Sequence, residues 1–140
     1  MLFRSVRLDL GEFDHGHWQV YGFGDMVRAE FDDNSDVPRI PPSRLGAGVE
    51  WHLGSWSSNL SWVHASRQDR VAEYETPTPG YDLLALDLSY RLPFGGRSIW
   101  ELFGKGRNLL DEDVRNHTSF LKDEAPQIGR NFIVGLRGSF

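Results

Sequence analysis

The chain has 140 residues, a length that allows one domain or a part of one. Apolar residues make up 39% and aromatic residues 13%, which excludes a disordered chain. The absence of cysteine excludes a disulfide scaffold, a thiol nucleophile and a cysteine zinc site. A net charge of -5 argues against a nucleic-acid-binding protein. No apolar run reaches the roughly 18 residues of a transmembrane helix, but transmembrane β-strands leave no such hydropathy peak.

Apolar and polar residues alternate along most of the chain, which predicts β-strands. The first alternating segment lies at residues 6–11. The second spans residues 18–31, where Asp25 falls among apolar residues on one face. Because glycine inside a strand often marks a bulge, we expect the two faces to exchange at a β-bulge near Gly22 or Gly24.

Five further segments alternate in the same way. They span residues 44–53, 56–66, 81–92, 98–107 and 131–140. The last is the clearest, with Val134 and Leu136 on its apolar face and Arg137 on the other, whereas Phe103 stands on the polar side of the segment before it. Together the segments predict about seven strands and no helix.

The connections between these segments alternate in length. The short ones are 14–17, 54–55 and 93–96, and the long ones are 32–43, 72–80 and 109–129. In an antiparallel up-and-down meander this places all long loops at one end, as in outer-membrane barrels with short periplasmic turns and long outer loops. A soluble β-sandwich or small barrel also explains the alternation. Strands of about 10 residues and a polar face rich in Gly, Ser, Asp and Arg favour the membrane barrel.

Three short motifs follow one another near the C-terminus, within residues 104–140. Residues 108–111 read Asn-Leu-Leu-Asp, residues 126–130 read Pro-Gln-Ile-Gly-Arg, and the chain ends in Phe140. In this order the motifs resemble the end of a TonB-dependent outer-membrane receptor, in which N-L-x-D closes the penultimate strand and P-x-x-G-R opens the last one. Residues 38–48 are similar to an upstream loop-to-strand junction of the same family.

The resemblance implies an all-β transmembrane barrel of about 22 strands, of which seven strands would be the last third. We therefore expect residues 1–140 to be the C-terminal part of the barrel, with the plug domain and the signal peptide absent. The implied partners are outer-membrane lipid, the remainder of the receptor, and the inner-membrane TonB motor through the missing N-terminal region. The terminal strand ending in Phe140 resembles the signal that the barrel-assembly machinery reads.

The implied function is energised uptake of a metal ion or metal chelate, such as zinc, an iron–siderophore or haem, across the outer membrane. No phosphate-binding loop, nucleophile elbow or defined catalytic triad is present, so we expect neither an enzyme nor a resident cofactor. A non-energised outer-membrane channel and a soluble β-rich binding domain are the alternatives.

One loop carries candidate metal ligands. His117 lies in the long loop 109–129 together with Asp111 and Asp113, and imidazole and carboxylate groups are zinc ligands. The loop looks most similar to the zinc-uptake branch of the family. We therefore expect these three residues to contribute to a metal site that other parts of the receptor complete. His15 and His17 share a short turn, which we interpret as an exposed polar turn.

Overall fold

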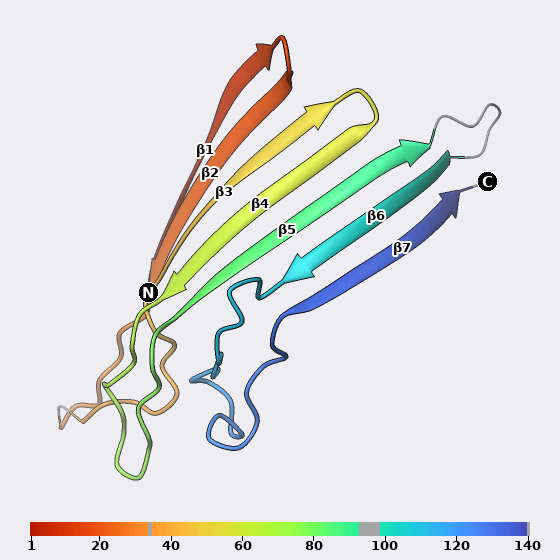
Figure 1. Ribbon diagram of the computed structural model, residues 1–140. Coiled ribbons are helices and arrows are strands. Elements are labelled where there is room, and N and C mark those ends of the chain that lie inside the picture. Colours follow the sequence, from red (N-terminus) through yellow and green to blue (C-terminus); the bar gives the residue numbers. More distant parts are fainter. Residues whose placement is uncertain (34, 93–98, 140) are drawn as a thin grey trace.

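The computed structural model describes residues 1–33, 35–92 and 99–139, which form one antiparallel sheet of seven strands in chain order (Figure 1). The strands are β1 (Leu2–Phe13), β2 (Gly16–Met26), β3 (Arg44–Leu53), β4 (Trp56–Ala65), β5 (Tyr81–Leu92), β6 (Ile99–Arg107) and β7 (Asn131–Ser139). This confirms the predicted all-β meander. No helix in these described ranges is long and apolar enough to cross a membrane.

The long loops lie together at one end of the sheet, as the alternation of loop lengths predicts (Figure 1). They are the β2–β3 loop (27–43), the β4–β5 loop (66–80) and the β6–β7 loop (108–130). The tight turns before β2 and β4 lie at the opposite end. The turn predicted at 93–96 and the terminal Phe140 fall outside the described residues. The strands have 9 to 12 residues, close to the length that crosses a bilayer at a tilt.

The prediction for the second strand was wrong in two respects. β2 ends at Met26 rather than at residue 31, and its pairing with both neighbours is regular through Gly22 and Gly24. No exchange of faces is needed, because Asp25 lies on the polar face of the sheet directly opposite Arg44 on β3. The apolar residues after Met26 belong to the loop.

The irregularity lies instead in β1, where the register with β2 shifts between Asp9 and Gly11. Gly11 has a φ of 83° in the left-handed region, which a glycine adopts without strain. The backbone N–H of Gly11 donates to Asp9 Oδ1 at 2.8 Å, so the side chain pairs a backbone group at the shift. The bulge thus coincides with a local hydrogen bond between Gly11 and Asp9. The alternation of apolar and polar residues in this segment did not predict it.

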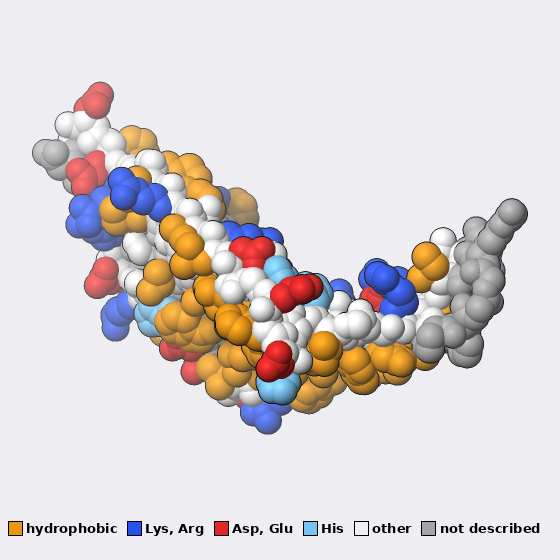
Figure 2. Space-filling model, turned by 90° about the horizontal axis from the view of Figure 1, so that it is seen from above, with side chains coloured by type: hydrophobic (Ala, Val, Ile, Leu, Met, Phe, Trp, Pro, Cys, Tyr) orange, Lys and Arg blue, Asp and Glu red, His pale blue; other side chains and the backbone are white. Residues whose placement is uncertain are grey.

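The two faces of the sheet differ in polarity because directly paired residues point to the same side. One apolar row across the sheet consists of Val20, Val49, Leu60, Leu86, Gly106 and Phe132. The paired row on the other side is polar from β1 to β6, with Asp9, Gln19, Glu50, Asn59, Asp87 and Lys105, and ends at Ile133 on β7. Figure 2 shows that the sheet is curved, with hydrophobic side chains along much of the convex surface and charged side chains on the concave one.

This single layer has almost no core of its own. Among the described residues the buried hydrophobic side chains are Ala65 and Val114, whereas Leu60, Phe132 and Val134 on the convex face stay exposed. A soluble domain buries its apolar face against a second layer. The exposed apolar face therefore requires an external apolar medium, as the lipid-facing side of a barrel does.

Aromatic rings mark the short-turn end of the convex face. The rings of Trp18 and Trp51 lie 6.1 Å apart, and those of Trp56 and Tyr90 lie 4.6 Å apart. The indole N–H of Trp51 donates to the carbonyl oxygen of His15 at 2.7 Å. Tryptophan and tyrosine gather in this way at the interface between bilayer and water, so this end of the sheet has the features of a membrane boundary.

Candidate functional site

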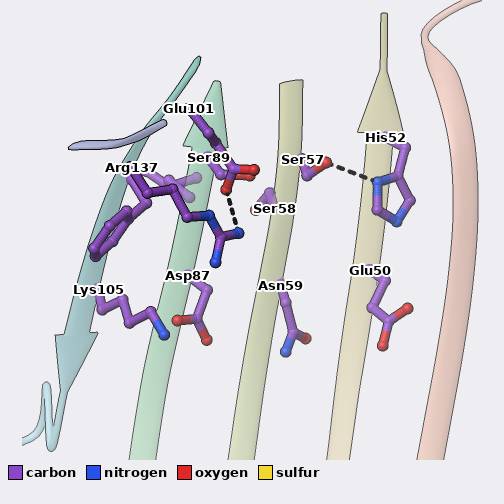
Figure 3. Close-up of a pocket in the computed structure, with 12 residues that line it drawn as sticks. Glu50, His52, Ser57, Ser58, Asn59, Asp87, Ser89, Glu101, Lys105 and Arg137 are labelled. Carbon is purple, nitrogen blue, oxygen red and sulfur yellow. Dashed lines mark hydrogen bonds and ion pairs between the residues drawn. The ribbon is translucent and has the colours of Figure 1, made fainter. Parts of the chain in front are cut away.

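The concave face holds a polar hollow across β3 to β7, with a volume of about 290 Å³ (Figure 3). Its lining includes Glu50, His52, Ser57, Asn59, Asp87, Ser89, Glu101, Phe103, Lys105 and Arg137. In the close-up these labelled polar side chains project from their strands into one shared space, and His52 Nδ1 lies 3.0 Å from Ser57 Oγ. Such a surface suits water or a polar partner rather than packed hydrocarbon.

Ion pairs between strands order this wall. They are Arg7–Glu50 (3.3 Å), Arg44–Asp25 (2.9 Å), Arg107–Asp87 (2.7 Å) and Arg137–Glu101 (2.8 Å). Because most of these side chains are partly exposed, each pair adds little to stability in water. Their effect is to hold charged groups in defined positions on the concave surface.

Aromatic rings on the concave face cover glycines of the neighbouring strand. A β-carbon added at Gly46 would overlap the ring of Phe23, and one added at Gly48 would overlap the ring of Tyr21. The glycines therefore leave the space in which the rings lie flat against the sheet. Tyr21 also donates from its hydroxyl to Asn59 Oδ1 at 3.1 Å, which ties β2 to β4 across β3.

The three long loops converge on the carboxylate of Glu75 in the β4–β5 loop. The backbone N–H of Arg39 donates to Glu75 Oε1 at 3.1 Å, and that of Ala72 donates to Oε2 at 3.2 Å. The ammonium of Lys122 lies 3.4 Å from Oε1 and donates to the carbonyl oxygen of Thr76 at 2.6 Å. One carboxylate thus joins the β2–β3, β4–β5 and β6–β7 loops.

Further contacts join the same loops at their edges. The guanidinium carbon of Arg39 lies 3.2 Å from the centre of the Phe120 ring, a cation–π contact. The amide of Gln68 donates to the carbonyl oxygen of Ile40 at 2.9 Å. Since these contacts connect segments distant in sequence, the long loops form one packed unit.

His117 lies inside this unit, with only 1% of its surface exposed. Its Nδ1 lies 3.0 Å from Thr78 Oγ1 and 3.5 Å from Lys122 Nζ. Its Nε2 lies 3.3 Å from Glu75 Oε1 but makes no hydrogen bond of acceptable geometry. Because an ammonium can only donate, Nδ1 is the acceptor here and the proton is assigned to Nε2.

The charges of this cluster follow from its surroundings. Burial, with the positive charge of Lys122 second, lowers the pKa of His117, so the imidazole is neutral at pH 7. Burial acts to raise the pKa of Glu75, but backbone donors from Ala72 and Arg39 and the ammonium of Lys122 outweigh it and lower the pKa. The cluster is therefore a carboxylate–ammonium pair beside a neutral imidazole.

The other two candidate ligands lie elsewhere. Asp111 Oδ1 accepts a hydrogen bond from the backbone N–H of Arg130 at 2.8 Å. Asp113 Oδ2 pairs with Arg115 at 3.2 Å. The structure does not bring either carboxylate to His117, and the described part of the chain contains no group of three or more His, Asp or Glu residues placed to hold a metal ion. Their assignment as ligands stays a prediction.

The contacts of Asp111 give the two C-terminal motifs a structural meaning. Asp111 belongs to the motif at 108–111, and Arg130 ends the motif at 126–130. Asn108, at the start of the first motif, accepts from the backbone N–H of Glu112 at 3.0 Å and donates to its carbonyl oxygen at 2.9 Å. The motifs thus close the two ends of the β6–β7 loop against each other, where β6 ends and β7 begins.

His15 and His17 have separate surroundings. His17 Nε2 lies 3.2 Å from Asp9 Oδ1, and its direct partner on the concave face is His52 of β3. His15 is bound through its backbone carbonyl to Trp51. The two imidazoles are thus not shown sharing a site. His15 lies exposed in the turn as predicted, but the prediction was wrong for His17, which is a half-buried residue of β2 because the strand pairing already begins at Gly16.

Sequence reasoning missed Glu75 and Lys122. Glu75 lies among polar loop residues with no recognisable motif, and Lys122 is one lysine beside Asp123 and Glu124. Their roles depend on contacts between residues 47 positions apart, for which the local pattern holds no signal.

A curved single-layer sheet with an apolar convex face and a wet concave face is a section of the wall of a transmembrane β-barrel. The family described as TonB dependent receptor-like, beta-barrel, matches residues 6–109, and the chain belongs to this family. Its members are outer-membrane receptors and transporters, which confirms the expected outer-membrane location and the expectation that the chain is not an enzyme.

A solved structure has the same fold. The chain is similar to the protein named Copper transporter OprC, with a TM-score of 0.78 and 20% sequence identity over 94% of this chain. The chain covers 21% of the length of that protein.

Proposed function

We propose that residues 1–140 form the C-terminal part of the barrel of an outer-membrane receptor that takes up a metal ion or metal chelate with energy from the TonB motor. The match of residues 6–109 to the receptor barrel family carries this proposal. The wet concave wall and the apolar convex face support it, because the first suits a filled polar lumen and the second suits lipid.

The proposal that the transported substrate is a metal rests on a different observation. The structurally similar protein is named as a copper transporter, so copper joins zinc, iron–siderophore and haem as candidate cargo. Copper and zinc ions both bind imidazole and carboxylate groups. A metal at His117 would have to displace Lys122 from Glu75, and Asp111 and Asp113 would have to leave Arg130 and Arg115.

The partners follow from the same role. Outer-membrane lipid covers the convex face, and further strands pair with the free edges of β1 and β7, since unpaired backbone groups are not tolerated in lipid. An N-terminal plug domain fills the lumen, and the TonB motor acts on that upstream region. The barrel-assembly machinery binds the terminal strand, which ends in Phe140.

Metal accumulation in cells tests the proposal. The complete gene is expressed as the only high-affinity route for copper or zinc, and uptake of each radioactive metal is measured with TonB present and with TonB deleted. We expect saturable accumulation of one metal that needs both the receptor and TonB. Accumulation that persists without TonB would identify a non-energised channel instead.

A further inference from the structure

Charge is distributed unevenly along the concave wall. On β1–β3 the carboxylates outnumber the guanidinium groups; these side chains are Asp9, Glu12, Asp25 and Glu50 against Arg7 and Arg44. On β5–β7 the cations outnumber the carboxylates; these side chains are Arg91, Lys105, Arg107 and Arg137 against Asp87 and Glu101. The described concave residues of β4 carry no charge. The wall therefore has a negative part and a positive part.

The excess positive charge comes from two side chains, Lys105 and Arg91, that form no ion pair with any described residue. Lys105 faces Asp87 directly, but Asp87 Oδ1 already accepts from Arg107 at 2.7 Å. The Lys105 ammonium instead lies 5.8 Å from the centre of the Phe103 ring and, within the described ranges, pairs with no carboxylate. It projects into the hollow from β6 (Figure 3).

Arg91 is placed in the same way beside the ion pair between Arg137 and Glu101. It lies directly opposite Glu101, but Glu101 Oε1 accepts from Arg137 at 2.8 Å. Arg91 is exposed and forms no ion pair with any residue that the structure describes. Lys105 and Arg91 are thus two cations on neighbouring strands, and the carboxylate directly opposite each of them is paired with another arginine.

We propose that this positive part of the wall binds an acidic segment of the domain that fills the lumen, with carboxylates of that segment paired to Lys105 and Arg91. The proposal rests on the proposed function for the presence of such a domain and adds the chemistry of its contact. Charge complementarity carries it, because ions at an interface of restricted solvent need partners of opposite sign. Complementary charges also fix the orientation of the domain, since the β1–β3 part of the same wall would repel that segment.

Zero-length cross-linking of the complete receptor tests this contact. A water-soluble carbodiimide joins an amine to a carboxylate only where the two already touch. The chain has two lysines, Lys105 and Lys122, and the second supplies an internal control because it lies 3.4 Å from Glu75. The carbodiimide concentration is raised until the Lys122–Glu75 link is detected by peptide mass spectrometry. The peptide that is cross-linked to Lys105 is then identified.

We expect Lys105 to be linked to an Asp or Glu upstream of the barrel. The Lys105→Arg variant keeps the charge but has no primary amine, so it should lose this link and retain the Lys122–Glu75 link. Lys105 left unlinked, or linked to Asp87, Glu101 or another barrel strand, overturns the proposal.

Charge reversal provides a second measurement. The double variant Lys105→Glu, Arg91→Glu should speed amide hydrogen exchange in the lumen-filling domain at least tenfold, while Arg70→Glu in the outer β4–β5 loop should leave it unchanged. Equal exchange in both variants contradicts the contact. Neither measurement depends on transport. If the receptor imports metal but Lys105 is not linked to the upstream domain, only this inference is overturned. If the link forms but uptake is not energised, only the proposed function is overturned.

Discussion

The ammonium of Lys122 lies 3.4 Å from the carboxylate of Glu75, although 47 residues separate the two in sequence. Both side chains are nearly buried, and the same carboxylate binds the backbone of Arg39 in a third loop. The long-loop end of this barrel section is therefore held together by one ion pair that joins two of its loops.

Replacing Lys122 by methionine should loosen the outer loops. The change leaves Glu75 with backbone donors but no cation, and removing one member of a nearly buried ion pair costs roughly 3 kcal/mol. Hydrogen exchange of the complete receptor should become faster in residues 66–80 and 108–130. Arg70→Ala is the control, because its pair with Glu30 is exposed and surface pairs contribute little. Equal hydrogen-exchange rates in the two variants would contradict the conclusion that the Lys122–Glu75 pair holds the loops together.

The outer loops should also open as the pH falls. The pKa of His117 is lowered by burial first and by Lys122 second, from an ordinary value of 6.5. The open loop therefore binds a proton more readily than the closed one, so the closed form is fully stable above about pH 6.5 and loses stability below it. Hydrogen exchange near Thr78 at pH 7.5 and 5.5 measures this. His117→Gln should remove most of the pH dependence, and an unchanged dependence would exclude His117 as its source.

Adjacent residues of β4 should respond differently to a new charge. Leu60 lies on the convex face and Ser61 on the concave one. Arginine on the lipid side near the bilayer midplane costs roughly 2–4 kcal/mol, while lumen positions tolerate charge. Leu60→Arg should thus reduce the heat-modifiable folded receptor in outer membranes more than Ser61→Arg does. The reverse order would show that the faces are exchanged.

Gly46 should not accept a side chain while Phe23 is present. A β-carbon at Gly46 overlaps the Phe23 ring, whereas Gly104 has no atom near the position of its missing β-carbon. Overpacking of this kind costs about 1–3 kcal/mol. Gly46→Ala should lower the denaturation temperature of the folded receptor, and Gly104→Ala should change it little. Adding Phe23→Leu to Gly46→Ala should cancel part of the loss, and purely additive effects would exclude the ring contact as the cause.

Single cysteines test which end of the sheet faces outward. The chain has no cysteine, and Tyr74 in the β4–β5 loop is 98% exposed. Tyr74→Cys should react with a membrane-impermeant thiol reagent on intact cells, because long loops of such barrels face the outside. Asp14→Cys in the short turn before β2 should react only after the outer membrane is opened. Labelling of Asp14→Cys alone would invert the assignment.

Much of the fold could be predicted from local patterns. In a strand, successive side chains point to opposite faces, so the alternation near Leu60 and Leu86 directly reports both the strand and its two environments. Since alternate connections of an antiparallel meander share an end, the alternation of loop lengths then predicted that all long loops lie together. The wrong prediction at Asp25 also came from reading residue types as faces. Asp25 alternates in step with Tyr21 and Phe23, and the mixture of charged and aromatic residues suggested a bulge, but all three side chains lie on the polar face of the sheet.

The candidate site depended on the tertiary structure. The sequence by itself determined the barrel wall, its apolar face and its motifs, because each of these depends on the local period of the backbone or on neighbouring residues. Only the folded chain decided that His117 lies against Glu75 and Lys122, that Asp111 binds Arg130, and that Lys105 forms no ion pair with the residues that the structure describes. Such contacts arise when the antiparallel sheet brings distant loops and strands to one place, and no local pattern encodes which of several similar charges will meet there.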